Sequence, residues 1–123
     1  MATLEITSDN LQHAIAADIV LLDFWAGWCG PCRAFGPVFD RASEANPDIV
    51  FGKVDTEAER ELAAGFQITS IPTLIAFRGG IMVYSQPGAL NSVQLNSLIE
   101  QIRGLEVAAI RSQKPQHPAA GAA

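Results

Sequence analysis

The sequence predicts an α/β domain in which helices cover both faces of a mixed β-sheet. Residues 19–25 are almost wholly apolar, as in a central strand that is covered on both faces. Apolar residues at helical spacing alternate along the chain with further short apolar runs, an order typical of an α/β layer structure. The pair Gly79-Gly80 separates the last two apolar runs and suits a tight hairpin with positive φ angles, which makes the sheet mixed.

The first half of the chain contains two expected strands and two expected helices. Residues 4–6 form a short edge strand, and the helix after it carries apolar residues at helical spacing: Leu11, Ala14 and Ile15. The central strand leads into a second helix that begins near the cysteines. The inner stripe of this helix consists of Phe35, Val38, Phe39 and Ala42. Asn46-Pro47 ends it, because the residue before a proline is disfavoured in the α region.

The second half adds three strands and two helices. The strands span residues 49–54, 73–77 and 81–85. A capping box with Thr56 as the cap and Glu59 three positions later is expected to start a short helix that stops at Gly65. Asn91 and Gln94 are expected to cap the last helix. Its buried side carries large aliphatic residues: Leu95, Leu98, Ile99 and Ile102.

Length and composition indicate one globular domain. The chain has 123 residues, and its apolar fraction of 49% and charged fraction of 17% are ordinary for a globular protein. Residues 1–111 are expected to form this domain. Residues 112–123 carry almost no large apolar side chain, so burial cannot offset the entropy lost on ordering them. We therefore expect them to form a disordered tail.

Charge and hydropathy argue against several classes of partner. Eight basic and 13 acidic residues give a net charge of −5, whereas binding to nucleic acids or anionic membranes requires clustered Lys and Arg. The first residues lack the basic start and apolar core of a signal peptide. No apolar run approaches the ~20 residues of a membrane-spanning helix. We therefore expect a cytoplasmic protein.

Cys29 and Cys32 are the only cysteines, and they directly follow the predicted central strand. In the cytosol a lasting structural disulfide is not expected, so such a pair is catalytic or metal-binding. A structural zinc site usually has four Cys or His ligands, and this chain adds only His13 and His117, both distant in sequence. Two cysteines and two distant histidines therefore argue against a metal site within one chain. A metal ion shared by two chains stays open as an alternative.

Several separated motifs resemble the thioredoxin family over residues 4–108. In order, they are Asp23-Phe24-Trp25-Ala26, Trp28-Cys29-Gly30-Pro31-Cys32, Pro37, Lys53-Val54-Asp55, Ile71-Pro72-Thr73-Leu74 and Gly88-Ala89-Leu90. The resemblance implies the thioredoxin fold, a five-stranded mixed sheet flanked by four helices. It also implies a monomeric protein-disulfide reductase that thioredoxin reductase recharges with electrons from NADPH. No bound cofactor is expected, because the redox-active Cys29–Cys32 disulfide itself carries the electrons. The sequence departs from the family pattern at Gly27, at Phe35-Gly36 and in the tail.

Cys29 is the expected nucleophile of the pair. It should lie at the first turn of the second helix, where unpaired N–H groups and the helix dipole favour a thiolate and lower the thiol pKa. Cys32 lies one turn further, close enough for a disulfide, and is expected to be less exposed and to resolve the mixed disulfide. Gly30 and Pro31 restrict the loop and tune the redox potential. Pro31 is expected at the first helical position, where no hydrogen bond is lost.

Asp23 is the candidate proton acceptor for Cys32. It interrupts the apolar strand, where a charge is costly to bury, and burial would raise its pKa toward neutrality. Alternatively, it is a strand-end carboxylate that reaches water or pairs with Lys53. The family resemblance favours the proton-transfer role, with Lys53 as its support. Lys53 itself is equally compatible with a solvated strand position.

A shallow apolar face beside the cysteines is the expected docking site for substrate. The resemblance implies a cis peptide bond before Pro72, although only about 5–6% of X-Pro bonds in folded proteins are cis. A cis bond would leave the backbone of Ile71 free to pair with an extended substrate segment. The expected face consists of Trp28, Gly30, Ile71, Pro72, Gly88 and Ala89. The alternatives are core packing for Trp28 and a plain turn for Gly88.

Two other functions are compatible with the same fold. An oxidase or isomerase would use the same dithiol in the opposite direction, but such relatives often carry histidine between the cysteines, whereas Gly30-Pro31 points to a reductant. The missing signal peptide agrees with a reductant. A non-catalytic module that only binds a partner also stays open, since idle cysteines would leave the sequence unchanged.

Overall fold

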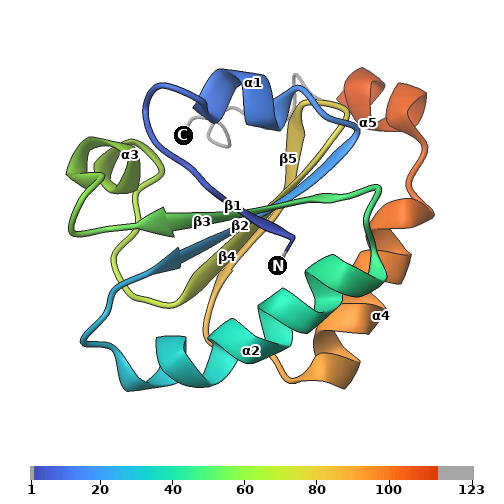
Figure 1. Cartoon of the computed structure of the whole chain (residues 1–123). Coiled ribbons are helices and arrows are strands. Elements are labelled where there is room, and N and C mark those ends of the chain that lie inside the picture. Colours follow the sequence, from blue (N-terminus) through green and yellow to red (C-terminus); the bar gives the residue numbers. More distant parts are fainter. Residues whose placement is uncertain (1, 114–123) are drawn as a thin grey trace.

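The computed structural model describes residues 2–113, which form a five-stranded sheet between layers of helices (Figure 1). In chain order the elements are β1 (Thr3–Glu5), α1 (Leu11–Ile15), β2 (Ile19–Trp25), α2 (Gly30–Ala45), β3 (Val50–Asp55), α3 (Arg60–Gly65), β4 (Thr73–Arg78), β5 (Ile81–Pro87), α4 (Ser92–Arg103) and α5 (Val107–Gln113). The mixed sheet with helices on both faces confirms the expected fold class, and α5 adds a fifth helix. None of the helices in this described part is long and apolar enough to cross a bilayer.

β2 lies at the centre of the sheet, whose strand order is β1-β3-β2-β4-β5. It pairs in parallel with β3 and antiparallel with β4, so that Asp23 lies opposite Lys53 on one side and opposite Leu74 on the other. β5 returns antiparallel along β4. The turn between them has positive φ at both Gly79 (61°) and Gly80 (82°), which confirms the expected glycine hairpin.

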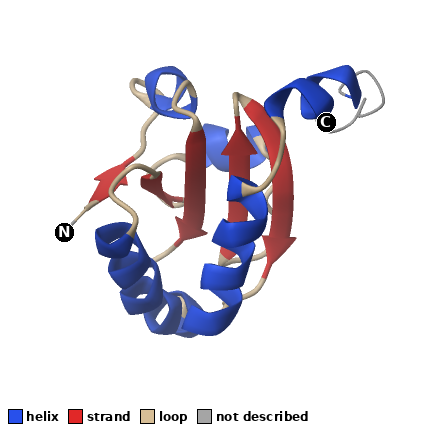
Figure 2. Cartoon of the chain, turned by 90° about the vertical axis from the view of Figure 1, so that its right-hand side faces the viewer, coloured by secondary structure: helices blue, strands red, loops and turns tan. Residues whose placement is uncertain are grey.

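The two faces of the sheet have separate cores. α2 and α4 cover one face, and α1 and α3 cover the other (Figures 1 and 2). Because successive side chains of a strand point to opposite faces, Ile19 and Leu21 pack in the core formed with α2 and α4, whereas Val20 and Leu22 pack in the core formed with α1. Asp23 has the same parity as Ile19 and Leu21. Its carboxyl therefore lies on the face that α2 covers.

Helix α5 packs beside the turn between β4 and β5 (Figure 2). A Cβ at Gly79 would lie 2.9 Å from a methyl group of Val107, so the turn leaves no room for a side chain there. Arg78 donates from Nη2 to the carbonyl of Leu105 in the connection before α5. The helix runs through residue 113, and residues 114–123 of the expected tail lie outside the described residues. The division into a domain and a tail stays a prediction.

The expected capping box before α3 is wrong. α3 begins at Arg60, and the residue before it, Glu59, makes no side-chain cap. Instead, Asp55 at the end of β3 accepts hydrogen bonds through Oδ1 from the N–H groups of Glu57 (2.9 Å) and Ala58 (3.3 Å). The Thr56 hydroxyl donates to the carbonyl of Trp25, 3.1 Å away. An Asx turn at the strand end therefore competes successfully with the capping box.

The capping box expected before α4 is confirmed and provides a stability test. Asn91 Oδ1 accepts from the N–H of Gln94 (2.8 Å), and Gln94 Oε1 accepts from the N–H of Asn91 (2.9 Å). Asn91→Ala removes one half of this exchange and should lower the free energy of unfolding by about 1 kcal/mol. Urea titration measures the change. Asn96→Ala, at an exposed position within α4, is the matched control and should leave stability unchanged or slightly higher.

Candidate active site

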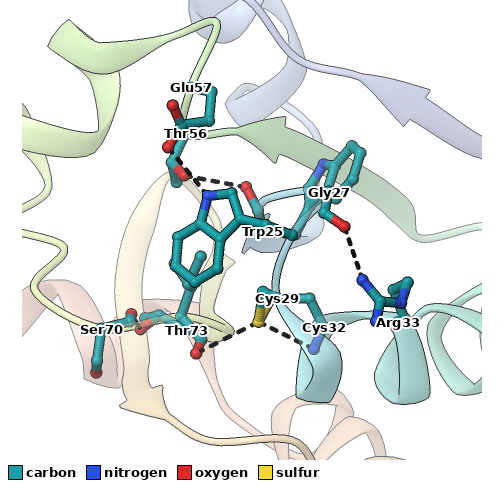
Figure 3. Close-up of a disulfide and its surroundings, with 11 residues drawn as sticks. Trp25, Gly27, Cys29, Cys32, Arg33, Thr56, Glu57, Ser70 and Thr73 are labelled. Carbon is teal, nitrogen blue, oxygen red and sulfur yellow. Dashed lines mark hydrogen bonds between the residues drawn. A yellow bond between two sulfur atoms is a disulfide. The ribbon is translucent and has the colours of Figure 1, made fainter.

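The two cysteines lie at the N-terminus of α2 (Figure 3). They form a disulfide whose Cα atoms are 5.2 Å apart, inside the normal range for such bonds. Each residue is only 4% exposed, so the expected difference in exposure between Cys29 and Cys32 is not present in the disulfide form. The difference lies in their surroundings, because Cys29 lines a surface cavity and Cys32 is not among its lining residues.

Cys29 is the N-cap residue of α2, with φ −87° and ψ 114°. Its sulfur accepts a hydrogen bond from the backbone N–H of Cys32, at 3.1 Å. The helix starts at Gly30, so Pro31 occupies the second helical position rather than the expected first. Its missing N–H still costs nothing there, because the first four N–H groups of a helix have no intrahelical partner. A sulfur at this position experiences both a direct donor and the positive end of the helix dipole, which favour its ionised form.

Asp23 is buried and has no hydrogen-bond partner. The residue is 1% exposed, and neither carboxyl oxygen is paired within the described part of the chain. Burial raises the pKa of Asp23 to about 7, while the nearby positive charge of Lys53 lowers it and the negative charge of Asp40 raises it. A strand-end carboxylate that reaches water is therefore not what the structure shows, and Lys53 acts on Asp23 through its charge, with no hydrogen bond between them. The carboxyl can exchange a proton near neutral pH.

Lys53 lies beside Asp23 beneath α2. The strand register places the two residues opposite each other on adjacent strands. The Lys53 ammonium lies 5.1 Å from the centre of the Trp25 ring, within the range of a cation–π interaction. Lys53 is half-buried, so the alternative of a fully solvated strand residue does not hold.

A cavity of about 490 Å³ opens next to Cys29. Its lining residues come from the cysteine loop and the start of α2, the loop after β3, α3 and the segment before β4: Trp28, Cys29, Gly30, Pro31, Thr56, Ala63, Ile68, Thr69, Ser70 and Ile71. The Ile71–Pro72 peptide bond is cis, as the resemblance implies. The carbonyl oxygen of Ile71 lies 3.8 Å from the Cys29 sulfur. An extended segment in this cavity would therefore pass directly over the sulfur.

Only some of the residues expected to form the docking face line this cavity. Trp28, Gly30 and Ile71 line the cavity, whereas Pro72 is buried beside it. Gly88 and Ala89 are exposed but do not line it, and the Gly88 N–H donates to the Pro72 carbonyl at 2.7 Å. The wall that sequence reasoning missed consists of Thr56, Ala63, Ile68, Thr69 and Ser70. No local signal marks these residues, because tertiary folding alone brings α3 and the following loop to the cysteines.

Trp28 forms an exposed rim of the cavity. It is 69% exposed, which contradicts core packing, and its indole N–H donates to Glu57 Oε2 at 3.3 Å. On the other side of the loop, Arg33 donates from Nη1 to the carbonyl of Gly27 at 2.9 Å. Among residues 2–113, no group of three or more His, Cys, Asp or Glu side chains is arranged to hold a metal ion.

Comparisons with known proteins agree with this geometry. The family model described as Thioredoxin matches residues 2–101. A putative thioredoxin 2 of Streptomyces coelicolor is 51% identical over 111 residues, covering 89% of this chain and 83% of that protein. A thioredoxin of Alicyclobacillus acidocaldarius is 41% identical over 103 residues, covering 82% and 98%. Among solved structures, a mutant thioredoxin from Halobacterium salinarum has a TM-score of 0.78 at 31% identity, covering 85% of this chain and 93% of that one.

Proposed function

This chain belongs to the thioredoxin family and is a thiol–disulfide oxidoreductase, and we propose that it reduces disulfides in other proteins through Cys29 and Cys32. The observation that carries the proposal is the position of the Cys29 sulfur. It caps α2, accepts the Cys32 N–H and lines an open cavity of a size that accepts an extended peptide segment. A sulfur in this position can be ionised and can be reached by a foreign disulfide.

The reaction proceeds by two exchanges of a sulfur–sulfur bond. The Cys29 thiolate attacks one sulfur of the substrate disulfide, forms a mixed disulfide with it and releases the other substrate sulfur as a thiolate, which takes a proton. Cys32 then loses its proton to Asp23, and its thiolate attacks the Cys29 sulfur. The Cys29–Cys32 disulfide forms as the second substrate sulfur leaves as a thiolate, which takes the proton that Asp23 holds. The substrate gains two electrons and two protons, and the protein loses them.

Asp23 suits the second exchange because of its place on the sheet. Its carboxyl lies on the face covered by α2. Cys32 belongs to the buried side of that helix, together with Phe35 and Gly36. A base is most effective when its pKa lies near the working pH, and the pKa of about 7 that burial gives Asp23 meets this condition.

The proposal includes the source of electrons and the compartment. As a monomer in the cytoplasm, the oxidised protein would be recharged by thioredoxin reductase with NADPH, because the cytosol keeps thiols reduced. Family membership and the Gly30-Pro31 pair between the cysteines support this direction. No bound cofactor is required, since the dithiol carries the two electrons.

A coupled assay tests the proposed function. The full chain is mixed with NADPH, a bacterial thioredoxin reductase and insulin, and NADPH consumption is followed together with insulin reduction. We expect catalytic turnover with many insulin molecules reduced per protein molecule. Turnover no faster than that of the reductase alone would contradict the proposal. Oxidation of a reduced protein substrate by the disulfide form, in a parallel assay, would support the oxidase alternative instead.

Trp28→Ala should weaken substrate binding without changing the chemistry. The indole is an exposed cavity wall, so its loss removes apolar contact with an extended protein substrate but leaves the cap of α2 intact. We expect KM for insulin to rise roughly tenfold, with little change in the alkylation rate of Cys29. Val93→Ala is the matched control, because Val93 is an exposed apolar residue (75%) that does not line the cavity. Equal KM values for the two variants would contradict the docking role.

A further inference from the structure

Beneath α2, the Asp23 carboxyl lies near Lys53 on the adjacent strand, and Asp40 of α2 is close enough for its charge to act on Asp23. Asp23 and Lys53 are opposite each other on β2 and β3, on the face of the sheet that α2 covers. Neither oxygen of Asp23 has a hydrogen-bond partner within the described part of the chain. On the β4 side, the residue opposite Asp23 is the apolar Leu74. The charges that act on Asp23 therefore come from Lys53 on β3 and from Asp40 on α2.

Gly36 lets the Lys53 ammonium approach the helix. Gly36 is buried on the inner side of α2, and a Cβ built there would lie 3.8 Å from Lys53 Nζ. A single methyl group would just touch the ammonium, and a longer side chain would take the space that it occupies. This glycine belongs to the pair at which the sequence departs from the family pattern. The missing side chain at Gly36 thus leaves a notch in α2 that gives room for the ammonium.

Asp40 occupies the same side of α2 one turn after Gly36. Residues four apart on a helix are neighbours, and helical side chains lean back toward the N-terminus, which here is the direction of Gly36. The Asp40 Oδ1 atom is buried and has no hydrogen-bond partner within residues 2–113. A nearby positive charge stabilises a buried carboxyl oxygen that has no donor, and the Lys53 ammonium lies beside Gly36 on this side of the helix.

If Asp23 and Asp40 are both ionised, the single positive charge of Lys53 can balance only one of the two negative charges. We propose that Asp40 is a positioning residue of the active site: it shares the Lys53 ammonium with Asp23 across the notch at Gly36 and thereby controls how readily Asp23 takes up and releases its proton. This inference rests on the proposed role of Asp23 in the second exchange. The negative charge of Asp40 raises the pKa of Asp23 because it makes ionisation harder, whereas the positive charge of Lys53 lowers it.

The test is the titration of Asp23 in the oxidised full-length protein. The side-chain carboxyl carbon of Asp23 is followed by NMR between pH 4 and 9. In Asp40→Asn the midpoint should fall by about one pH unit, the size of a neighbouring-charge effect at a partly buried site. Asp40→Glu should restore most of the wild-type midpoint. The pH profile of mixed-disulfide resolution should move to lower pH with the midpoint.

A matched control separates this effect from a change in overall charge. Glu44→Gln removes one negative charge from an exposed position on the same helix and should move the midpoint by less than about 0.2 units. Asp40→Ala serves as a second variant if the asparagine form does not fold. A midpoint that moves no more in Asp40→Asn than in Glu44→Gln would overturn the inference.

The same experiment distinguishes this inference from the proposed function. If Asp23→Asn slows resolution but Asp40→Asn leaves the Asp23 midpoint unchanged, then Asp23 keeps its role and Asp40 loses its own. If Asp40→Asn moves the midpoint but Asp23→Asn resolves at the wild-type rate, the proton-transfer role fails. In that case the coupling would be an electrostatic feature without a part in the reaction, which would overturn the positioning role as well.

Discussion

Cys29→Ser is expected to abolish protein-disulfide reduction, with a loss of roughly 10³-fold or more in the coupled assay. The structure gives Cys29 alone both properties that the first exchange needs, namely the cap position of α2 and a place in the cavity wall. A serine hydroxyl at the same position stays protonated at neutral pH, and its oxygen does not form a stable bond to a substrate sulfur. The remaining thiol of Cys32 is not among the residues that line the cavity.

Cys32→Ser is the matched control, because it removes the second exchange and leaves the first. This variant should attack insulin at close to the wild-type rate and then stop, with the mixed disulfide on Cys29 accumulating as a species that mass spectrometry detects. Cys29→Ser should form no such adduct at neutral pH. Adducts of equal amount in the two variants would contradict the assignment of Cys29 as the nucleophile.

Asp23→Asn is expected to change both the kinetics of the reaction and the way in which the free energy of unfolding depends on pH. The direction of the pH effect follows directly from the raised pKa of Asp23. Burial raises the pKa of Asp23 from 3.8 to about 7, so the folded protein keeps this proton over a range in which the unfolded chain has lost it. Between these two values stability therefore falls as the pH rises, by at most about 1.4 kcal/mol per pH unit from this group. Below pH 3.8 both states are protonated, and above pH 7 both are ionised, so the contribution is constant there.

Urea titrations at several pH values measure this effect in the oxidised protein, in which no thiol titrates. Between pH 5 and 7 the wild-type protein should lose about 2 kcal/mol more stability than Asp23→Asn, since asparagine does not ionise. The difference between the two proteins removes the titration of carboxylates common to both, such as Asp48 with its hydrogen bonds to Arg103. Parallel stability curves would contradict a raised pKa for Asp23.

The kinetic effect of Asp23→Asn concerns the second exchange. Without a carboxylate to accept its proton, Cys32 should resolve the mixed disulfide about 10²-fold more slowly at pH 7, at the lower end of the range for general acid–base catalysis. The rate should recover at high pH, where the Cys32 thiol ionises without help. The first exchange, measured as alkylation of Cys29, should change little. Resolution at the wild-type rate at pH 7 would remove Asp23 from the mechanism.

The features that the sequence predicts well are those with local causes. Gly79-Gly80 fixes a hairpin because the turn needs positive φ, and Asn91 caps α4 because its side chain reaches an N–H only three residues away. Asp23 is conspicuous in the sequence as the one charged residue of an apolar strand. The prediction that Thr56 caps α3 fails for an equally local reason. The neighbouring carboxylate of Asp55 accepts the backbone N–H groups of the two residues after Thr56.

The features that sequence reasoning missed depend on contacts between distant segments. Ile68 and Ser70 become a cavity wall because α3 and its following loop fold over the cysteine loop, about forty residues earlier in the chain. In the sequence, Gly36 is notable only because it departs from the family pattern. Its structural role becomes visible only when the fold brings Lys53 of β3 next to it. The partial burial of Asp40 likewise follows from the packing of α2 on the sheet. Periodicity and capping signals carry no information about such juxtapositions.

The rate of Cys29 alkylation as a function of pH is the most direct measurement of thiolate formation at the N-terminus of α2. The reduced Cys32→Ser protein is treated with iodoacetamide from pH 4 to 10, and free cysteine is treated in parallel. We expect the midpoint for Cys29 to lie at least about one unit below the value near 8.5 of a free thiol, with the modification confined to Cys29. A midpoint at or above that of free cysteine, or a thiol that does not react in the folded protein, would contradict the assignment of Cys29 as the ionised and accessible nucleophile.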